Sequence, residues 1–509
     1  MLKKIFFPIV LSAVAVSCTS DYERINIDPN RPTSLPLDYL LSECEILVPA
    51  SPDAGSKTQR VNFANAGCLM QHMSSTDAGF YAGSFYSSAS NTYTFFFDYT
   101  YPNTVKNIVN LIALSSEDPN QVNINSMARI LKVMEFVRIT DLYGDVPYFE
   151  AGRGFLDNNF TPRYDEQQDI YMDMLNELQE AGDAFNSGAY IPPTADFIYD
   201  GDLEKWKRAA NSIMLRLALR LQNVDPASAQ SWAQTAISRG LITSEAENIT
   251  FHFDGQSGSQ INTNPNSYTL SPIGANVANL NGLLWGKTFI DMMHNRQDPR
   301  LSVVAALKDG NNDPDVQVGL PNGVTANELA TLPVTNLDLY SRPAPNMITG
   351  SAPWIYMTYA ESQLLLAEAI ERGYTSGSAD AAFASGQASA ITLVGVYGTT
   401  PTAGEVADYA TANPYPATGL EAKLNAIHTE IYLIHAVTFN HIEAWANWRR
   451  TGYPVLVPVN PVGNETNGTI PRRLKYSPTE YGVNGENLGE AITRQGPDLF
   501  TTRVWWDNN

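Results

Sequence analysis

Apolar residues recur at intervals of three and four along much of this sequence, which is the spacing of one buried helix face. The stretch 125–150, NSMARILKVMEFVRITDLYGDVPYFE, shows the pattern most clearly. Its apolar positions are Ile130, Leu131, Val133, Met134, Val137 and Ile139. They predict a helix with a wide buried face rather than a thin surface stripe.

A capped start and a closing turn are predicted at the two ends of this helix. Asn125 or Ser126 can cap the start, and Gly144 can take the left-handed conformation that closes a helix. Pro147 prevents continuation, and Asp145 can accept hydrogen bonds from nearby backbone amides. We therefore interpret the polar residues at this helix end as structural.

The same spacing predicts a mainly helical chain. The predicted helices span residues 36–48, 61–74, 103–115, 164–185, 203–221, 227–240, 287–295, 353–372, 379–394 and 420–450. Paired helices with short connections indicate stacked helix-turn-helix units. The predicted fold class is mainly α, a helical-repeat scaffold with a loop-rich, irregular second part packed against it.

The loop-rich part covers residues 248–351. It is rich in Gly, Asn, Pro, Ser and Thr, and its one clear strand signal is ITFHF at 249–253. Long irregular segments are uncommon in a compact domain unless they carry function. The tail from residue 470 is also predicted to be irregular.

The N-terminus has the pattern of a lipoprotein signal peptide. Lys3 and Lys4 precede an apolar segment that ends near residue 17 and is too short for a confident transmembrane span. A small residue stands before Cys18, as in lipoprotein cleavage boxes. We expect Cys18 to carry the acyl chains of a lipid anchor, with an extended tether over 18–35. The alternative is a plain secretory signal with an incidental cysteine.

Composition narrows the classes of partner. The formal net charge of -21 disfavours nucleic acid and anionic membrane surfaces, but neutral glycans and cationic peptides remain compatible with it. Cys44 and Cys68 are expected to be buried thiols, although a disulfide between them stays open. The sequence has no His/Cys cluster with zinc spacing, and we predict no cofactor.

Aromatic residues are the candidate ligand contacts, because a sugar ring can pack its C–H face on an aromatic ring while polar groups bind its hydroxyls. The candidates are Phe80, Tyr81, Phe85, Tyr86, Tyr93, Tyr268 and Trp285. Most of them lie among Gly, Ser and Asn. Core packing is the competing interpretation for each, and it is favoured for Phe95–Phe97 and for Trp354.

Two other chemistries receive less support. The segment 309–315 places oxygen ligands at alternating positions, but Pro314 stands where a calcium loop of the EF-hand type needs glycine. The sequence contains no nucleophile elbow, phosphate-binding loop or metalloprotease helix. We predict no enzymatic activity, although a glycosidase with two carboxylates stays open.

Several segments resemble the SusD/RagB family of nutrient-binding outer-membrane lipoproteins. They are TDLYGDVPY at 140–148, the helix at 206–220, DPRL at 298–301, the helix at 359–373, and the C-terminal segments 443–454, 471–476 and 503–507. The YGDVPY-type turn and the closing WWD are similar to one subgroup of that family. The matching segments extend over nearly the whole chain.

The resemblance implies a single domain over residues 36–509, built on a tetratricopeptide-like scaffold. It also implies a cell-surface lipoprotein in the outer membrane that captures an oligosaccharide and delivers it to a SusC-like TonB-dependent transporter. Capture of a peptide by the same lid mechanism is the alternative within the family. From other classes, a surface glycosidase and an adaptor that binds only protein remain open.

Overall fold

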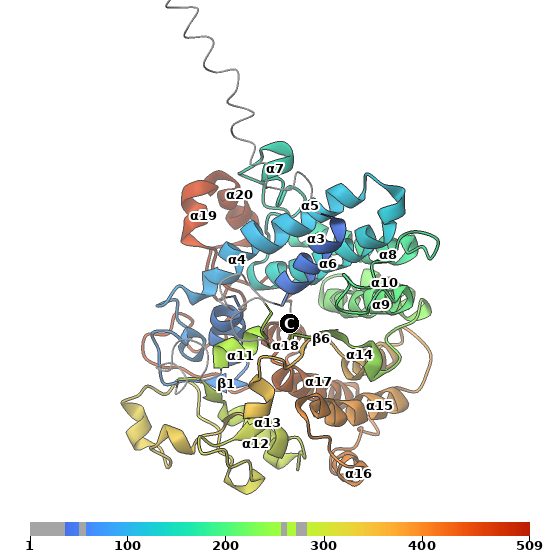
Figure 1. The fold of residues 1–509 in the computed structure, drawn as a ribbon. Coiled ribbons are helices and arrows are strands. Elements are labelled where there is room, and N and C mark those ends of the chain that lie inside the picture. The colour runs from blue at the N-terminus through green and yellow to red at the C-terminus, as the bar shows by residue number, and fades with distance from the viewer. Residues whose placement is uncertain (1–35, 50–56, 256–261, 271–281, 509) are drawn as a thin grey trace, which may run out of the picture.

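The computed structural model describes residues 36–49, 57–255, 262–270 and 282–508. The predicted signal peptide, Cys18 and the predicted tether lie outside the described residues. The described chain is mainly helical, which confirms the predicted fold class (Figure 1). Among the described residues, no helix combines the length and the apolar character that crossing a bilayer requires.

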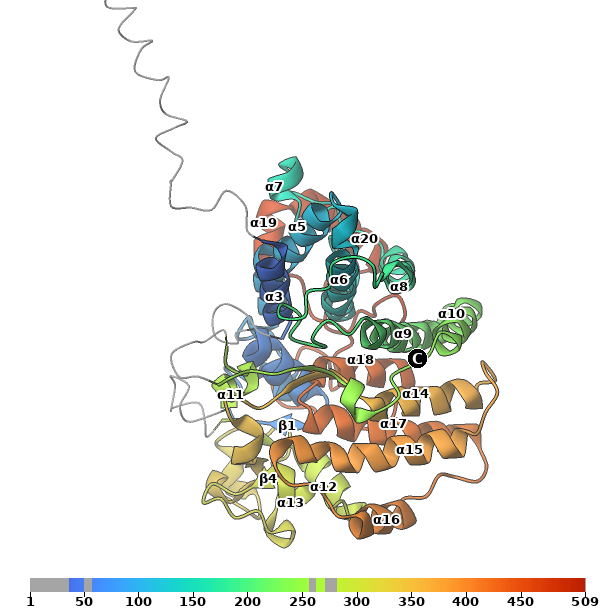
Figure 2. The same ribbon diagram turned by 45° about the vertical axis from the view of Figure 1, so that its right-hand side comes forward.

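The upper part of the molecule in Figures 1 and 2 holds the helices of the first half of the chain, joined by the last two helices. The elements are α3 (Leu37–Leu47), α4 (Phe95–Tyr99), α5 (Lys106–Ser115), α6 (Val122–Tyr143), α7 (Gly154–Asp157), α8 (Gln167–Ala184), α19 (Pro478–Val483) and α20 (Gly485–Gln495). Next to α8 lie α9 (Leu203–Arg220) and α10 (Pro226–Ser238). Two π-helices, Thr58–Gly67 and Thr100–Val105, complete this half.

The lower part contains two groups of elements. On the right of Figure 1 lie α14 (Tyr359–Glu371), α15 (Ala379–Thr392), α16 (Ala403–Ala412) and α17 (Leu420–Val437), with α18 (His441–Thr451) at the centre. On the left lies the loop-rich part with α11 (Pro265–Leu270), α12 (Lys287–Asn295) and α13 (Leu301–Val304). Short antiparallel pairs join β1 (Met73–Ser74) to β3 (Leu284–Trp285), β2 (Ile249–Phe251) to β6 (Trp354–Met357), and β4 (Ala305–Ala306) to β5 (Arg342–Pro343).

Helix α6 begins earlier than predicted. It starts at Val122, directly after a turn in which the Asp118 carboxylate accepts a hydrogen bond from the Asn120 amide at 2.9 Å. Asn125 instead donates its side-chain amide to the Ile112 carbonyl of α5 at 3.0 Å, and Ser126 is buried inside the helix. The predicted cap at these two residues is therefore wrong, because both residues lie inside the helix and not at its start.

The turn after α6 is fixed by contacts with α20. Gly144 has a positive φ of 86°, but its ψ of -122° lies outside the left-handed helical region that we predicted. The next amide, of Asp145, donates to the Gln495 side-chain oxygen at 2.8 Å. The Asp145 carboxylate accepts from the Gln167 amide at 3.0 Å, at the start of α8. The expected bonds from Asp145 to backbone amides are confirmed, and the turn joins three helices.

Other elements also differ from the prediction, including the helix predicted over 61–74, because Met73 and Ser74 form strand β1. Residues 354–357 form strand β6 because they pair with β2, and helix α14 starts only after Thr358, whose hydroxyl caps it at 3.0 Å from the Glu361 amide. The predicted helix 420–450 is two helices, separated where Phe439 takes a positive φ of 56°. The tail predicted to be irregular contains α19 and α20, and α16 was not predicted.

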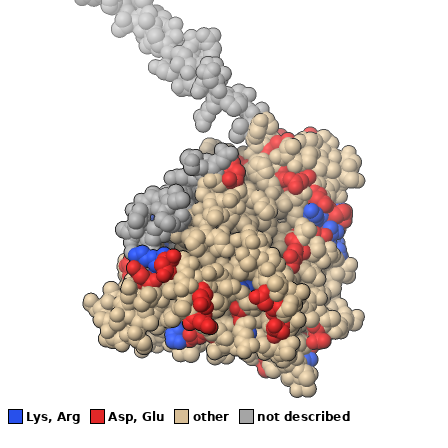
Figure 3. Space-filling view, turned by 60° about the horizontal axis from the view of Figure 1, so that its bottom comes forward, with Lys and Arg blue, Asp and Glu red and all other residues tan. Residues whose placement is uncertain are grey.

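The two cysteines of the described residues are buried thiols, as the sequence predicted. Cys44 and Cys68 are free and buried, so no disulfide joins them. Figure 3 shows patches of Asp and Glu larger than those of Lys and Arg, separated by wide uncharged areas.

In the segment 309–315, the side chains of Asp309, Asn311 and Asp313 each accept a bond from a backbone amide two residues on, which is the geometry of a polar turn.

We predict that Gly144→Ala destabilises the protein. A Cβ at this position would lie 1.6 Å from the Gln495 side-chain oxygen, and the positive φ is unfavourable for alanine. We expect a loss of about 2 kcal/mol or more in the free energy of unfolding, measured by urea titration.

Gly489→Ala is the control, because Gly489 lies within α20 and a Cβ there meets nothing within 4 Å. Removing a mid-helix glycine should leave the free energy of unfolding unchanged or raise it by up to about 1 kcal/mol. Equal stabilities of the two variants would contradict this account of the turn.

Candidate functional site

The aromatic residues predicted between 80 and 93 lie mostly in the interior. Tyr81, Phe85, Tyr86 and Tyr93 are all buried, whereas Phe80 is half-buried and meets Tyr81 edge to face with 5.0 Å between ring centroids. The Tyr86 hydroxyl accepts a bond from the Val459 amide at 3.3 Å. In this conformation Phe80 alone of these five presents part of its side chain to solvent.

Trp285 is fully buried. The side chain of Tyr268 lies outside the part of the chain that the structure describes. The Trp285 indole donates to the Val304 carbonyl at 3.0 Å, and its ring stacks on Phe439 at 5.8 Å. Phe439 in turn lines a cavity. Trp285 therefore packs against the Phe439 ring and does not itself line the cavity.

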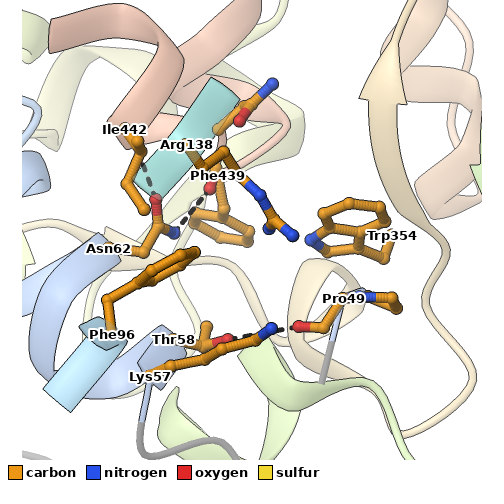
Figure 4. Close-up of a pocket in the computed structure, with 10 residues that line it drawn as sticks. Pro49, Lys57, Thr58, Asn62, Phe96, Arg138, Trp354, Phe439 and Ile442 are labelled. Atoms are coloured by element: carbon orange, nitrogen blue, oxygen red, sulfur yellow. Dashed lines mark hydrogen bonds between the residues drawn. The ribbon is translucent and has the colours of Figure 1, made fainter. Parts of the chain in front are cut away.

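The cavity shown in Figure 4 brings together cations from the first half of the chain and aromatic rings from both halves. Its volume is about 20 Å³, which is room for about one water molecule. Its lining consists of Pro49, Lys57, Thr58, Asn62, Phe96, Arg138, Trp354, Phe439, Asn440 and Ile442. The Arg138 guanidinium points toward the Trp354 ring, and Trp354 is half-buried (Figure 4).

The side chains that line the cavity come from several different helices and one strand. Asn62, on the first π-helix, donates to the Phe439 carbonyl at 2.7 Å and accepts from the Ile442 amide at 3.2 Å. These two bonds attach the π-helix to the break between α17 and α18. Phe96 comes from α4, Arg138 from α6, and Trp354 from the first position of β6.

Two cations share one buried carboxylate beside this cavity. The Lys57 ammonium lies 2.9 Å from one oxygen of Glu135, and Arg138 pairs with the other oxygen. Arg138 also donates to the Val48 carbonyl at 2.7 Å. The three side chains carry a net charge of about +1, so the cavity is locally positive within an acidic protein.

The cations also lie over aromatic faces. The Arg138 guanidinium carbon is 5.6 Å from the Trp354 ring centroid and 5.3 Å from that of Phe96, and Lys57 lies 5.3 Å from Phe96. Among the described residues the Arg138 Nε has no hydrogen-bond partner. The site therefore offers hydrogen-bond donors next to an aromatic face, which suits the oxygen atoms of a polar ligand.

A second aromatic surface begins at Phe95, the residue before Phe96 on α4. Phe95 stacks on Tyr99 with 5.4 Å between ring centroids, and the Arg60 guanidinium lies 3.6 Å above Phe95. All three residues are half-buried. Phe95 and Trp354 pack against the core, as expected, but stay half-buried, whereas Phe96 and Phe97 are buried within it.

The sequence carries little signal that could have identified Trp354. It follows Ser351, Ala352 and Pro353, and its position depends on pairing with residues about a hundred positions earlier. An aromatic residue directly after a turn and at the start of a strand is the one local sign.

Comparisons with known proteins agree with this architecture. A sequence profile of SusD-like proteins, described as starch-binding and associating with the outer membrane, matches residues 38–477. A solved chitin-binding protein is 32% identical, with a TM-score of 0.82 and coverage of 93% of this chain and 100% of its own. A Bacteroidetes SusD-like protein is 25% identical, with the same coverage and a TM-score of 0.79.

A chitin-binding SusD homologue from Flavobacterium johnsoniae shares the fold, with 22% identity, a TM-score of 0.75, and coverage of 93% of this chain and 99% of its own. A comparison with curated proteins finds no match. The profile and the first structure confirm the resemblance that the sequence motifs indicated.

We predict that Glu135→Gln destabilises the protein by about 3–5 kcal/mol, because Lys57 and Arg138 would remain buried without a compensating charge. Thermal or urea unfolding measures the loss. Glu177→Gln is the matched control, since Glu177 also pairs with one Arg and one Lys, both on α6. Because its side chain is 19% exposed, this substitution should lower the free energy of unfolding by less than about 1 kcal/mol. A smaller loss for Glu135→Gln than for Glu177→Gln would refute the assignment.

Proposed function

We propose that this chain, which belongs to the SusD-like family described as starch-binding and associating with the outer membrane, captures an oligosaccharide at the cell surface without catalysis. The bound glycan is then delivered to a SusC-like TonB-dependent transporter. The observation that carries the proposal is the half-buried Trp354 ring beside the Arg138 guanidinium, at a cavity on a chain of this family.

The chemistry of the cavity supports a neutral or weakly acidic glycan. Trp354 offers an aromatic face for the C–H side of a sugar ring, and the amides of Asn62 and Asn440 together with Arg138 offer polar contacts for hydroxyls. Because the cavity itself is small, we expect the ligand to lie across its opening, with Phe95 and Phe80 as further contacts. The remaining aromatic candidates from the sequence stay predictions.

The local charge argues against the two alternatives. A basic peptide would meet Lys57 and Arg138, which outnumber Glu135 at this site. Glycoside hydrolysis requires a pair of carboxyl groups flanking the scissile bond. The described residues that line the cavity include no Asp or Glu, so this site favours binding over hydrolysis.

We predict that Trp354→Ala weakens glycan binding by about tenfold, equivalent to ~1.4 kcal/mol, through loss of the aromatic face. The measurement is calorimetric titration of the protein starting after Cys18 with chitin oligosaccharides and maltooligosaccharides. These sugars are chosen because of the family description and the chitin-binding relative.

Trp232→Ala is the matched control, since Trp232 is also half-buried but lies on α10, away from the cavity. It should bind the same oligosaccharide with unchanged affinity. If the two variants bind equally well, or if peptides bind and none of the sugars does, the proposal fails.

We also predict that Cys18→Ser releases the protein from the membrane. Acylation at a single cysteine is the attachment that the signal peptide indicates, and without buried acyl chains the described helices offer no substitute. Fractionation of cells followed by immunoblotting measures the distribution. Membrane association that is equal in the wild-type protein and the variant would rule out the anchor.

A further inference from the structure

A second cavity lies at the turn that follows α6. Its volume is about 210 Å³, and its lining consists of Asp145, Glu166, Gln167, Gln168, Arg494, Gln495, Arg503 and Trp505. It shares no lining residue with the cavity that contains Trp354. The walls come from the turn after α6, the first turn of α8, the end of α20 and the C-terminal segment.

Internal contacts hold the walls in place. Arg494 lies 3.2 Å from the Asp145 carboxylate and donates to the Tyr164 carbonyl at 2.8 Å. Arg503 lies 3.0 Å from the carboxylate of Asp507. The site is therefore built from side chains with defined positions, and the C-terminal segment forms one wall of it.

The charges that line this cavity cancel. Arg494 and Arg503 contribute two positive charges, while Asp145 and Glu166 contribute two negative charges. A ligand with a net charge would gain little from such a lining, whereas a neutral ligand that both donates and accepts hydrogen bonds can use the positions on these groups that their internal contacts leave open. This balance separates the second cavity from the locally positive first one.

One polar atom of the lining lacks a partner. Gln167 is fully buried, and its side-chain amide donates to the Thr140 carbonyl at 2.8 Å. Within the described residues, its Oε1 accepts no hydrogen bond. A buried acceptor without a partner is costly, but this atom has almost no accessible surface, so Gln167 belongs to the wall of the cavity and is not counted among the ligand contacts.

Trp505 adds an apolar face to this polar lining. It is half-buried, and its ring lies 6.3 Å from that of Tyr171. A sugar ring combines one apolar C–H face with hydroxyls that donate and accept. Pockets for drug-sized ligands begin at about 300 Å³, so the smaller volume here suits a single ring.

We propose that this cavity is a second carbohydrate site, which binds one neutral sugar ring against Trp505. It goes beyond the proposed function, because it is separate from the cavity with Trp354 and does not depend on it. A single ring makes few contacts, so the expected dissociation constant is on the order of millimolar.

The test uses ligand-observed saturation-transfer NMR in the Trp354→Ala background, which weakens the contribution of the first cavity. The probes are methyl glucoside, N-acetylglucosamine and the anionic sugar galacturonate. We expect a saturable signal for at least one neutral sugar, with galacturonate binding at least fivefold more weakly. The same signal should appear in the protein that retains Trp354.

Gln168→Ala, added to the Trp354→Ala background, should weaken neutral-sugar binding at least fivefold. Gln168 is exposed, so this change leaves the fold intact. Trp505→Ala should abolish the signal, with circular dichroism confirming that the variant is folded. Trp232→Ala in the same background should bind as the background does.

Three outcomes would overturn the proposal. They are the absence of a saturable signal with every neutral sugar, equal binding before and after Gln168→Ala, and stronger binding of galacturonate than of the neutral sugars. A failure of Trp354→Ala to weaken oligosaccharide binding would count against the proposed function alone, because Gln168→Ala and Trp505→Ala change only the second cavity.

Discussion

A buried chain of ion pairs holds the helices of this protein in one arrangement. It runs through Asp141, Arg220, Glu443, Arg216, Glu361 and His435, with successive contacts of 3.4, 2.5, 3.8, 2.7 and 3.2 Å. These residues come from α6, α9, α18, α14 and α17. Burial alone would raise the pKa of Glu361, but Arg216 and His435 lower it to about 2. Since an unpaired buried charge costs several kcal/mol, each helix depends on the others for its position.

Both cavities depend on this arrangement through α6. Asp141 joins the network on one side of the helix and accepts a bond from the Trp506 indole at 2.9 Å, which places the C-terminal segment and hence Trp505. Arg138 on the same helix lines the first cavity and pairs with the buried Glu135 beside it. The ion pairs fix the helices before any ligand binds. The side chains that line each cavity are therefore already in place, which lowers the entropic cost of binding.

The scaffold could be predicted from the sequence far better than the site. The helical periodicity of 203–221 and 287–295 identified α9 and α12 closely, because that pattern is local. The strand at 354–357 was missed because its pairing with β2 is a contact between distant segments. Burial of Tyr81 and Trp285 is equally non-local: a Gly- and Ser-rich neighbourhood indicates a loop but does not show what packs over it. The polar end of α6 was interpreted as structural, but its sequence does not show that Asp141 belongs to an ion-pair network that joins five helices.

Net charge is a poor guide to the ligand of such a protein. The charge of -21 made basic peptides seem compatible, yet the first cavity carries two cations for one carboxylate and the lining of the second is balanced. Charges on the surface are screened over about 8 Å at physiological ionic strength, so distant Asp and Glu contribute little inside a cavity. What a ligand meets is the local set of partners that the fold assembles. For both cavities that set consists of hydrogen-bonding groups beside a half-buried tryptophan, and it is this combination on which we base the two proposed sugar sites.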